Sequence, residues 1–239
     1  MNHRHAPRLL LLALVLTLMP SVSASAQAPA AKTFPPAVVD SLDYRVLLSL
    51  QQRRTPVADR LWVGVSGSLA LAPLPAVGLS AAAVFTHDPL ARPGLTDQAF
   101  EAALSLFINA AATSAIKNTI RRPRPWIAHS DSLVCIQHVS GYSFPSGHTS
   151  FTFAAATSLS LLFPRWYIIL PSALWACSVG YSRLYIGAHY PSDVLVGALV
   201  GTGSALLAHW LARRAASAAP SGVAPIPAAP ALPIISLSF

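Results

Sequence analysis

Uncharged, mostly apolar segments alternate with short polar ones along this chain of 239 residues. The longest, residues 61–85, carries no charged side chain and is long enough to cross a hydrocarbon core of about 30 Å as a helix, with a kink expected near its two prolines. Shorter apolar segments follow at residues 102–116, 149–163, 166–182 and 194–210. Because a backbone in lipid must satisfy its hydrogen bonds internally, the pattern predicts an all-α membrane bundle of about five transmembrane helices.

The N-terminus has the pattern of a secretory signal sequence, residues 1–26. Arg4 and Arg8 give a basic start, residues 9–19 form an apolar core, and residues 24–26 (Ala-Ser-Ala) make a small-residue cleavage site. If the signal is not cleaved, it remains as an anchor and adds a sixth helix. Either version exports the segments that follow.

The segment before the first predicted span has helical periodicity. Residues 40–54 place aliphatic side chains on one helical face and charged ones opposite, which predicts a helix lying in the membrane interface. The aliphatic positions are Leu42, Val46, Leu47 and Leu50. Thr55 and Pro56 then have the order of an N-cap and a first helical residue.

Changes in composition set the expected boundaries. After the signal at residues 1–26, a Pro/Ala-rich linker covers residues 27–39. The helical membrane domain is expected at residues 40–212, followed by an Ala/Pro-rich tail at residues 213–239.

The overall composition supports a membrane protein and narrows its partners. Hydrophobic residues make up 54% of the chain and charged residues only 10%, whereas soluble domains carry roughly 25% charged residues. The formal net charge is +8, yet the basic residues gather at segment ends and in short motifs, without an aromatic-basic platform that could read bases. We therefore expect the membrane, and no nucleic acid, as a partner.

Three short clusters hold the residues that point to chemistry, namely residues 117–125 (KNTIRRPRP), 145–148 (PSGH) and 182–193 (SRLYIGAHYPSD). Phosphoryl transfer requires a nucleophile placed in line and positive charge around three equatorial oxygens. Lys117, Arg124 and Arg183 could supply that charge. The clusters therefore favour a phosphoryl-transfer site that needs no metal.

Two histidines in these clusters differ in their surroundings. An imidazole that attacks phosphorus must be neutral and aimed, usually by donating its second ring proton to a carboxylate, and Asp193 follows His189 by one helical turn. His148 comes directly after Ser146 and Gly147, where an apolar helix begins. Backbone N–H groups at that helix start can hold phosphate oxygens while His148 protonates the leaving oxygen.

In order and spacing, the three clusters resemble the signature of the type 2 phosphatidic acid phosphatase and vanadium haloperoxidase superfamily: K-x6-RP, PSGH and SR-x5-H-x3-D. The resemblance implies a helical bundle with a phosphohistidine intermediate on His189, acid and base roles for His148, and support from Asp193. For the phosphatases of the family it also implies that no metal or other cofactor takes part. The residues that match the family's phosphate-binding positions are Lys117, Arg124, Ser146, Gly147 and Arg183.

These observations predict a phosphatase of the bacterial inner membrane that acts on a phosphorylated lipid. Alternation of the apolar segments across the membrane brings all three clusters to the exported side, so the active site should face the periplasm. Undecaprenyl pyrophosphate, phosphatidic acid, phosphatidylglycerol phosphate or a lipid A phosphate would all fit, because no motif selects a headgroup. The oligomeric state is left open.

Three alternatives remain at this point. Several apolar segments are shorter than a full span, which would suit a soluble periplasmic acid phosphatase. A vanadium haloperoxidase would use the same residues to bind vanadate, with His189 as the metal ligand. A noncatalytic membrane scaffold would not need the intact motifs.

Two pairs of residues are ambiguous in the sequence. Cys135 and Cys177 could form a disulfide in an oxidising compartment or remain unpaired. Arg121 and Arg122 could contact a second phosphate or headgroup, or extend along the membrane interface with their charges in water.

Overall fold

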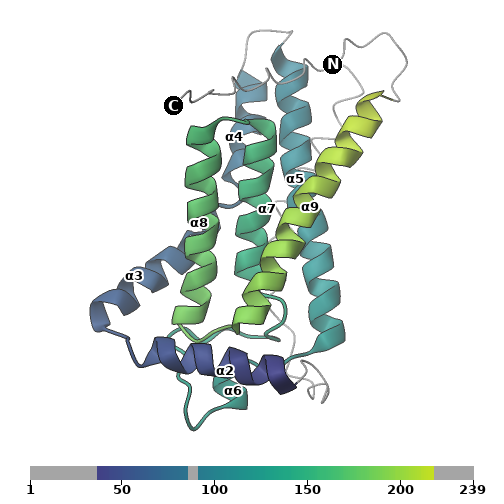
Figure 1. Ribbon diagram of the computed structural model, residues 1–239. Helices are drawn as coiled ribbons and strands as arrows, with labels where there is room; N and C mark the ends of the chain where they lie inside the picture. Colours follow the sequence, from purple (N-terminus) through teal and green to yellow (C-terminus); the bar gives the residue numbers. More distant parts are fainter. Residues whose placement is uncertain (1–36, 86–90, 218–239) are drawn as a thin grey trace, which may run out of the picture.

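The computed structural model describes residues 37–85 and 91–217, and within these ranges the chain is helical without strands (Figure 1). The predicted signal sequence and most of the predicted linker and tail lie outside the described residues. The elements in chain order are α2 (Ala37–Gln51), α3 (Pro56–Gly67), the 3-10 helix η2 (Ser68–Leu71), α4 (Leu74–Phe85), α5 (Ala91–Ile120), α6 (Pro125–Ala128), α7 (Gly147–Leu162), α8 (Trp166–Tyr185) and α9 (Pro191–Ser217).

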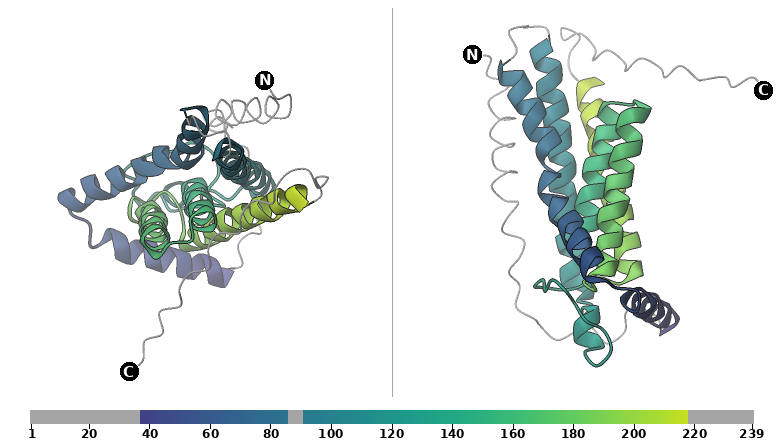
Figure 2. Two further views of the ribbon diagram at one scale, coloured as in Figure 1. Left: turned by 90° about the horizontal axis from the view of Figure 1, so that it is seen from above. Right: turned by 90° about the vertical axis from the view of Figure 1, so that its left-hand side faces the viewer.

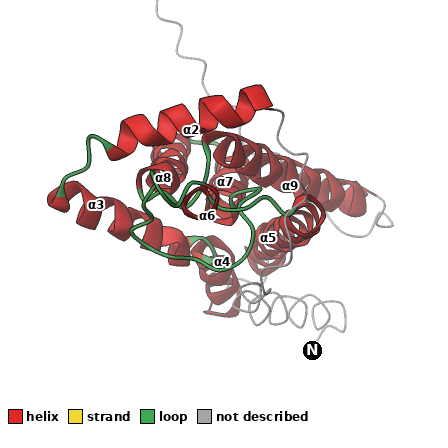
Figure 3. Cartoon of the chain, turned by 90° about the horizontal axis from the view of Figure 1, so that it is seen from below, coloured by secondary structure: helices red, strands yellow, loops and turns green. Residues whose placement is uncertain are grey.

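The long helices form a bundle with α2 along one edge of its lower end. Helices α5, α7, α8 and α9 run side by side with α4 in the upper part of the bundle, and α2 lies across the lower ends of α8 and α9 (Figures 1 and 2). Viewed from that end, loops and α6 occupy the middle and α2 lies beside them (Figure 3). All three predicted clusters therefore reach the same end of the bundle, as their chemistry requires.

Three helical stretches are long and apolar enough to cross a membrane: Pro56–Leu79, Gly94–Ala128 and Pro191–Ser217. They contain most of the first predicted span and all of those at residues 102–116 and 194–210. The all-α membrane bundle is thus confirmed for the described residues. Of the other two predicted spans, α7 has 16 residues and α8 has 20, with Pro171 inside the helix.

The first predicted span is broken rather than kinked. Helix α3 ends at Gly67, η2 follows, and α4 starts at Leu74, just after Pro73. The indole Nε1 of Trp175 in α8 donates to Ser68 Oγ at 2.9 Å and so ties the break to the bundle. As predicted, the Thr55 side chain caps α3 by accepting from the Ala58 N–H.

Helix α2 places a charged residue on the side that packs against the bundle. It starts at Ala37, inside the predicted linker. Asp43 and Leu47 are buried against the bundle, whereas Leu42 and Val46 are 56% and 42% exposed. The expected separation of apolar and charged faces is therefore wrong, because the Asp43 carboxylate pairs with a buried arginine.

Glycines on α9 let it approach α7 closely. A Cβ added at Gly197 would lie 2.7 Å from the Ser146 carbonyl oxygen, and one at Gly201 would lie 2.1 Å from the Ser150 carbonyl oxygen. Small residues at such contacts bring helix backbones together in membranes. They seat the first turns of α7, which carry His148, directly against α9.

We expect Gly201→Ala to lower the free energy of unfolding by about 1–3 kcal/mol, because the new methyl group would overlap backbone atoms that cannot rotate away. Thermal unfolding of the purified protein in detergent, followed by tryptophan fluorescence, measures the change. Gly203→Ala is the matched control, since its Cβ would meet nothing within 4 Å. Equal melting temperatures for the two variants would contradict close α7–α9 packing.

Candidate active site

The PSGH cluster forms the start of α7. Ser146 is its N-cap, and its Oγ accepts hydrogen bonds from the N–H and the hydroxyl of Thr149 at 3.5 and 2.9 Å. The Ser146 N–H donates to the Asp193 carbonyl oxygen at 3.0 Å, which joins this turn to α9. A Cβ added at Gly147 would meet nothing within 4 Å, so the first residue of α7 is open on that side.

His189 lies at the centre of the site and is 2% exposed. Its Nε2 is 3.2 Å from Arg124 Nη1. Because a guanidinium only donates, Nε2 is the acceptor and the ring proton sits on Nδ1. Nδ1 faces Asp193 Oδ2 at 3.6 Å, as the motif predicts, but beyond hydrogen-bond distance.

The surroundings of His189 keep its imidazole neutral. Burial lowers the pKa of His189 well below 6.5, and the positive charges of Arg124, Arg183 and Lys117 lower it further. A neutral ring with its lone pair on Nε2 is the form that can attack phosphorus.

Asp193 is fully buried in the first turn of α9 and has a partner for each oxygen. Oδ2 accepts from the Ser143 hydroxyl and from the Tyr190 N–H, the latter at 2.9 Å. Oδ1 accepts from Arg122 Nη1 at 2.8 Å. These bonds fix the carboxylate plane beside His189.

Two of the predicted phosphate-binding cations are held by backbone carbonyl groups. Lys117 Nζ donates to the carbonyl oxygens of Tyr142 and Pro145 at 2.8 and 3.0 Å. Arg124 donates to carbonyl oxygens on both sides of the site, those of Gly141 and Ala188 among them. Both cations are thus fixed in place by hydrogen bonds to the backbone.

The third cation, Arg183, has hydrogen-bond donors that no group in the described residues accepts. It is fully buried at the end of α8, and its Nη1 donates to Ser66 Oγ of α3. Its Nε and Nη2 are buried without a hydrogen-bond partner. Within the described residues, neither Lys117, Arg124 nor Arg183 makes a salt bridge to a carboxylate, so the cluster has a net positive charge suited to an anion.

His148 stands on the first turn of α7, half-buried. Burial, reinforced by Arg183, Arg124 and Lys117, lowers the pKa of His148 to about 3. Its imidazole is therefore neutral in the free site, because the ambient pH lies above that pKa. A bound phosphate would offset the same cations and favour protonation of the ring.

Arg122 is the site residue that sequence reasoning missed. It was considered for a second phosphate or for the membrane interface, yet it is 1% exposed and salt-bridged to Asp40, Asp43 and Asp193. Arg121 does remain exposed, with its Nε bonded to the Asn118 carbonyl oxygen. Neither Ser66 nor Ser143 lies at a signature position, so no motif signalled them.

The ambiguity about the two cysteines is resolved by the side chains that the structure describes. Cys135 is buried and Cys177 is exposed, and both are free thiols. In the described ranges, no three His, Cys, Asp or Glu side chains converge in a way that could hold a metal ion.

The model of the PAP2 superfamily matches residues 98–216, a region that contains both histidines, Asp193 and the three cations of the cluster. The chain belongs to the PAP2 superfamily. Helices α2, α3 and α4 precede the matched PAP2 region.

Curated PAP2 relatives match only part of the chain. It is 37% identical over 97 residues to the lipid A 1-phosphatase of Rhizobium johnstonii, a match that covers 38% of each protein. It is 44% identical over 78 residues to the undecaprenyl-diphosphatase BcrC of Bacillus subtilis, covering 33% of this chain and 38% of that relative. The chain thus matches little more than a third of the length of these relatives.

A solved structure extends the likeness to most of the fold. LpxE of Aquifex aeolicus superposes with a TM-score of 0.60 at 25% identity, covering 76% of this chain and 99% of that one. The helical PAP2 fold is therefore shared well beyond the three motifs.

We expect the PAP2 site to bind orthovanadate, a trigonal-bipyramidal mimic of a phosphoryl group in transfer, and Arg183→Lys to weaken that binding about tenfold or more. A lysine cannot reproduce the planar fork of donors, and losing a bond to a charged group costs about 1.5–3 kcal/mol. The rise in melting temperature with orthovanadate concentration measures the affinity.

The exposed Arg213, near the other end of α9, provides the control variant Arg213→Lys. Equal orthovanadate affinities for Arg183→Lys and Arg213→Lys would rule out Arg183 as an anion ligand.

Proposed function

We propose that this protein is a metal-independent phosphatase that hydrolyses a lipid phosphate or lipid pyrophosphate through a phosphohistidine on His189. The observation that carries the proposal is a neutral His189, with its Nε2 lone pair directed at a buried cluster of cations that lack carboxylate partners. Such a cluster is stabilised by an anion, and the nucleophile already lies within it.

In the first step, His189 Nε2 attacks phosphorus while Lys117 and the guanidinium groups hold the equatorial oxygens. The bond from phosphorus to the leaving oxygen breaks, and that oxygen takes a proton from His148, whose protonation is favoured once the anion is bound. The lipid product leaves with a hydroxyl group or, from a pyrophosphate, as a monophosphate.

In the second step, His148 accepts a proton from a water molecule, whose oxygen attacks the phosphohistidine. The bond from phosphorus to Nε2 breaks, inorganic phosphate is released and His189 returns to its neutral form. Asp193 stabilises the positive charge that the ring carries in the intermediate.

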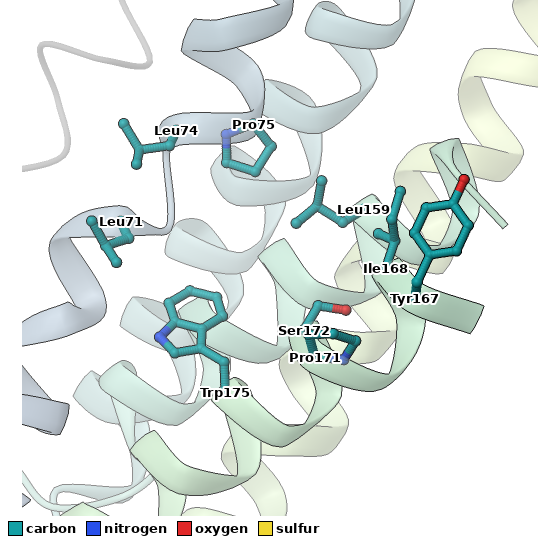
Figure 4. Close-up of a pocket in the computed structure, with 9 residues that line it drawn as sticks. All are labelled: Leu71, Leu74, Pro75, Leu159, Tyr167, Ile168, Pro171, Ser172 and Trp175. Atoms are coloured by element: carbon teal, nitrogen blue, oxygen red, sulfur yellow. The ribbon is translucent and has the colours of Figure 1, made fainter. Parts of the chain in front are cut away.

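An apolar cavity favours a lipid over a water-soluble ester as the substrate. It has a volume of about 540 Å³ and lies where α4 begins, against α7 and α8 (Figure 4). Leu159 is twelve residues along α7 from Gly147, and Pro171 is twelve residues along α8 from Arg183, which is roughly 18 Å in a helix. A chain reaching through one leaflet of about 15 Å would extend from the phosphate site to this cavity. Its lining residues are Leu71, Leu74, Pro75, Leu159, Tyr167, Ile168, Pro171, Ser172 and Trp175.

The setting that we propose is the bacterial inner membrane with the active site on the periplasmic face. Three apolar helical stretches support the membrane location, and the predicted signal sequence supports the periplasmic orientation.

Names of relatives suggest a panel of substrates: lipid A phosphates and undecaprenyl pyrophosphate. Release of inorganic phosphate from this panel, with phosphatidic acid added and water-soluble esters as controls, tests the activity. Vanadate-dependent bromide oxidation would instead indicate a haloperoxidase.

We expect phosphoenzyme to accumulate in His148→Ala when the substrate is phenyl phosphate. A phenol leaves without full protonation, so the first step proceeds while hydrolysis of the intermediate stays slow. The measurement is acid-labile, base-stable labelled phosphate on the protein after a quench. The control is the double variant His148→Ala/His189→Ala, which lacks the nucleophile. Equal labelling of the two variants would exclude His189, and absence of label in both would favour direct attack by water.

We expect Ile168→Trp, which fills the cavity, to raise KM roughly tenfold for a long-chain phosphatidic acid and to leave KM for its dihexanoyl form unchanged. Leu170→Trp is the matched control, because Leu170 lies on the same turn of α8, 54% exposed, and does not line the cavity. Equal effects of Ile168→Trp on both chain lengths would argue against a lipid chain in the cavity.

A further inference from the structure

Arg122 joins three carboxylates that come from opposite ends of the chain. Its Nη1 donates to Asp193 Oδ1 at 2.8 Å, and its Nη2 donates to Asp43 Oδ2 at 2.8 Å. Asp40, which is half-exposed, accepts a further bond from Nη2 at 3.0 Å. The guanidinium also lies over the Tyr190 ring, 3.7 Å from its centroid. Both terminal nitrogens of Arg122 thus donate to carboxylates.

Asp43 has a second partner next to the nucleophile. Its Oδ1 accepts from the Ser192 N–H at 2.9 Å, and its Oδ2 also accepts from the Ser192 hydroxyl. Ser192 directly precedes Asp193 in the first turn of α9. One carboxylate of α2 therefore holds both the arginine that binds Asp193 and the backbone that carries Asp193.

The geometry of Asp193 depends on this arrangement. Arg122 occupies Oδ1, which leaves Oδ2 as the oxygen that faces His189 Nδ1. The other donors to Oδ2, Ser143 and Tyr190, fix its distance from the ring but not the rotation of the carboxylate about its own axis. Without Arg122, Asp193 would be a buried charge without a cationic partner within salt-bridge distance.

Helix α2 is anchored at its other end as well. The Gln51 side chain makes two hydrogen bonds with the backbone of Val134, at 2.7 and 2.9 Å. Leu47 packs with Leu133 and Tyr190 in one apolar cluster. The helix is thus held alongside the site loops (Figures 1 and 3), and it contributes Asp43 from outside the matched PAP2 region.

We propose that Asp43 and Arg122 are positioning residues that act through Asp193 to hold His189 with its proton on Nδ1 and its lone pair on Nε2. This inference rests on the proposed function, because it assigns how the same nucleophile is aimed. The pair affects the phosphoryl-transfer step and not anion binding, since Lys117, Arg124 and Arg183 do not contact it.

The test is Asp43→Asn in the full-length protein, which keeps the shape of the side chain and removes its charge. We expect kcat for the best lipid phosphate to fall by about 10²-fold, which is the loss expected when a catalytic group is displaced by about 1 Å. KM and the affinity for orthovanadate should stay within about twofold of the wild-type values. Asp131→Asn, which alters an exposed carboxylate in the loop at the same end, should match wild type. Arg122→Lys should retain more turnover than Arg122→Gln, because it keeps a cation near Asp193.

A measurement that needs no turnover separates this inference from the proposed function. NMR of protein labelled with ¹⁵N-histidine reports the ring tautomer, with His189→Ala used to assign the signal. We expect His189 to carry its proton on Nδ1 in wild type and to populate both tautomers in Asp43→Asn. If wild type hydrolyses no lipid phosphate, the proposed function fails and the tautomers alone decide the positioning role.

Two results would overturn the inference. One is an Asp43→Asn variant that matches Asp131→Asn in kcat and in the His189 tautomer. The other is a loss of kcat that is accompanied by an equal loss of orthovanadate affinity, because Asp43 would then support the site as a whole and not the nucleophile.

Discussion

The structure depends on one electrostatic constraint: three cationic side chains are buried together and, within the described residues, none of them pairs with a carboxylate. Lys117, Arg124 and Arg183 lie within one cluster, and backbone carbonyls and the Ser66 hydroxyl are the groups that hold them. In a medium of low dielectric constant such a cluster is costly, and a bound anion would lower that cost. The close α7–α9 contact and the capped start of α7 hold the first turn of α7 in place.

The one carboxylate beside the nucleophile is kept away from these cations. Asp193 is neutralised by Arg122, not by Lys117 or Arg124, and Arg122 is in turn balanced by Asp43. Two separate charge systems thus lie side by side: a balanced one around Asp193 and an unbalanced one that, in the proposed function, binds the anion. If Asp193 paired with the phosphate-binding cations, the site would compete with its own ligand.

Much of the site could be predicted, because each signature residue lies in a local pattern with a chemical meaning. Asp43 and Arg122 lack such a pattern, since they are 79 residues apart and an aspartate on an amphipathic helix resembles a solvated residue. The break after α3 depends on a contact between Ser68 and Trp175, 107 residues apart. Helix α5 extends beyond its apolar segment at both ends, and in the added N-terminal part Glu101 pairs with His209 of α9.

The contacts of Asp43 with the start of α9 join the first and last helices that the structure describes. A chain is made from its N-terminus, so α2 emerges long before Ser192 and Asp193 exist. Arg122 then has only the carboxylates of α2 to bind, and His189 has no aspartate. The surroundings of His189 are therefore completed by the last helix that the structure describes. Under the proposed function, a nascent chain cannot aim its nucleophile until α9 has been made.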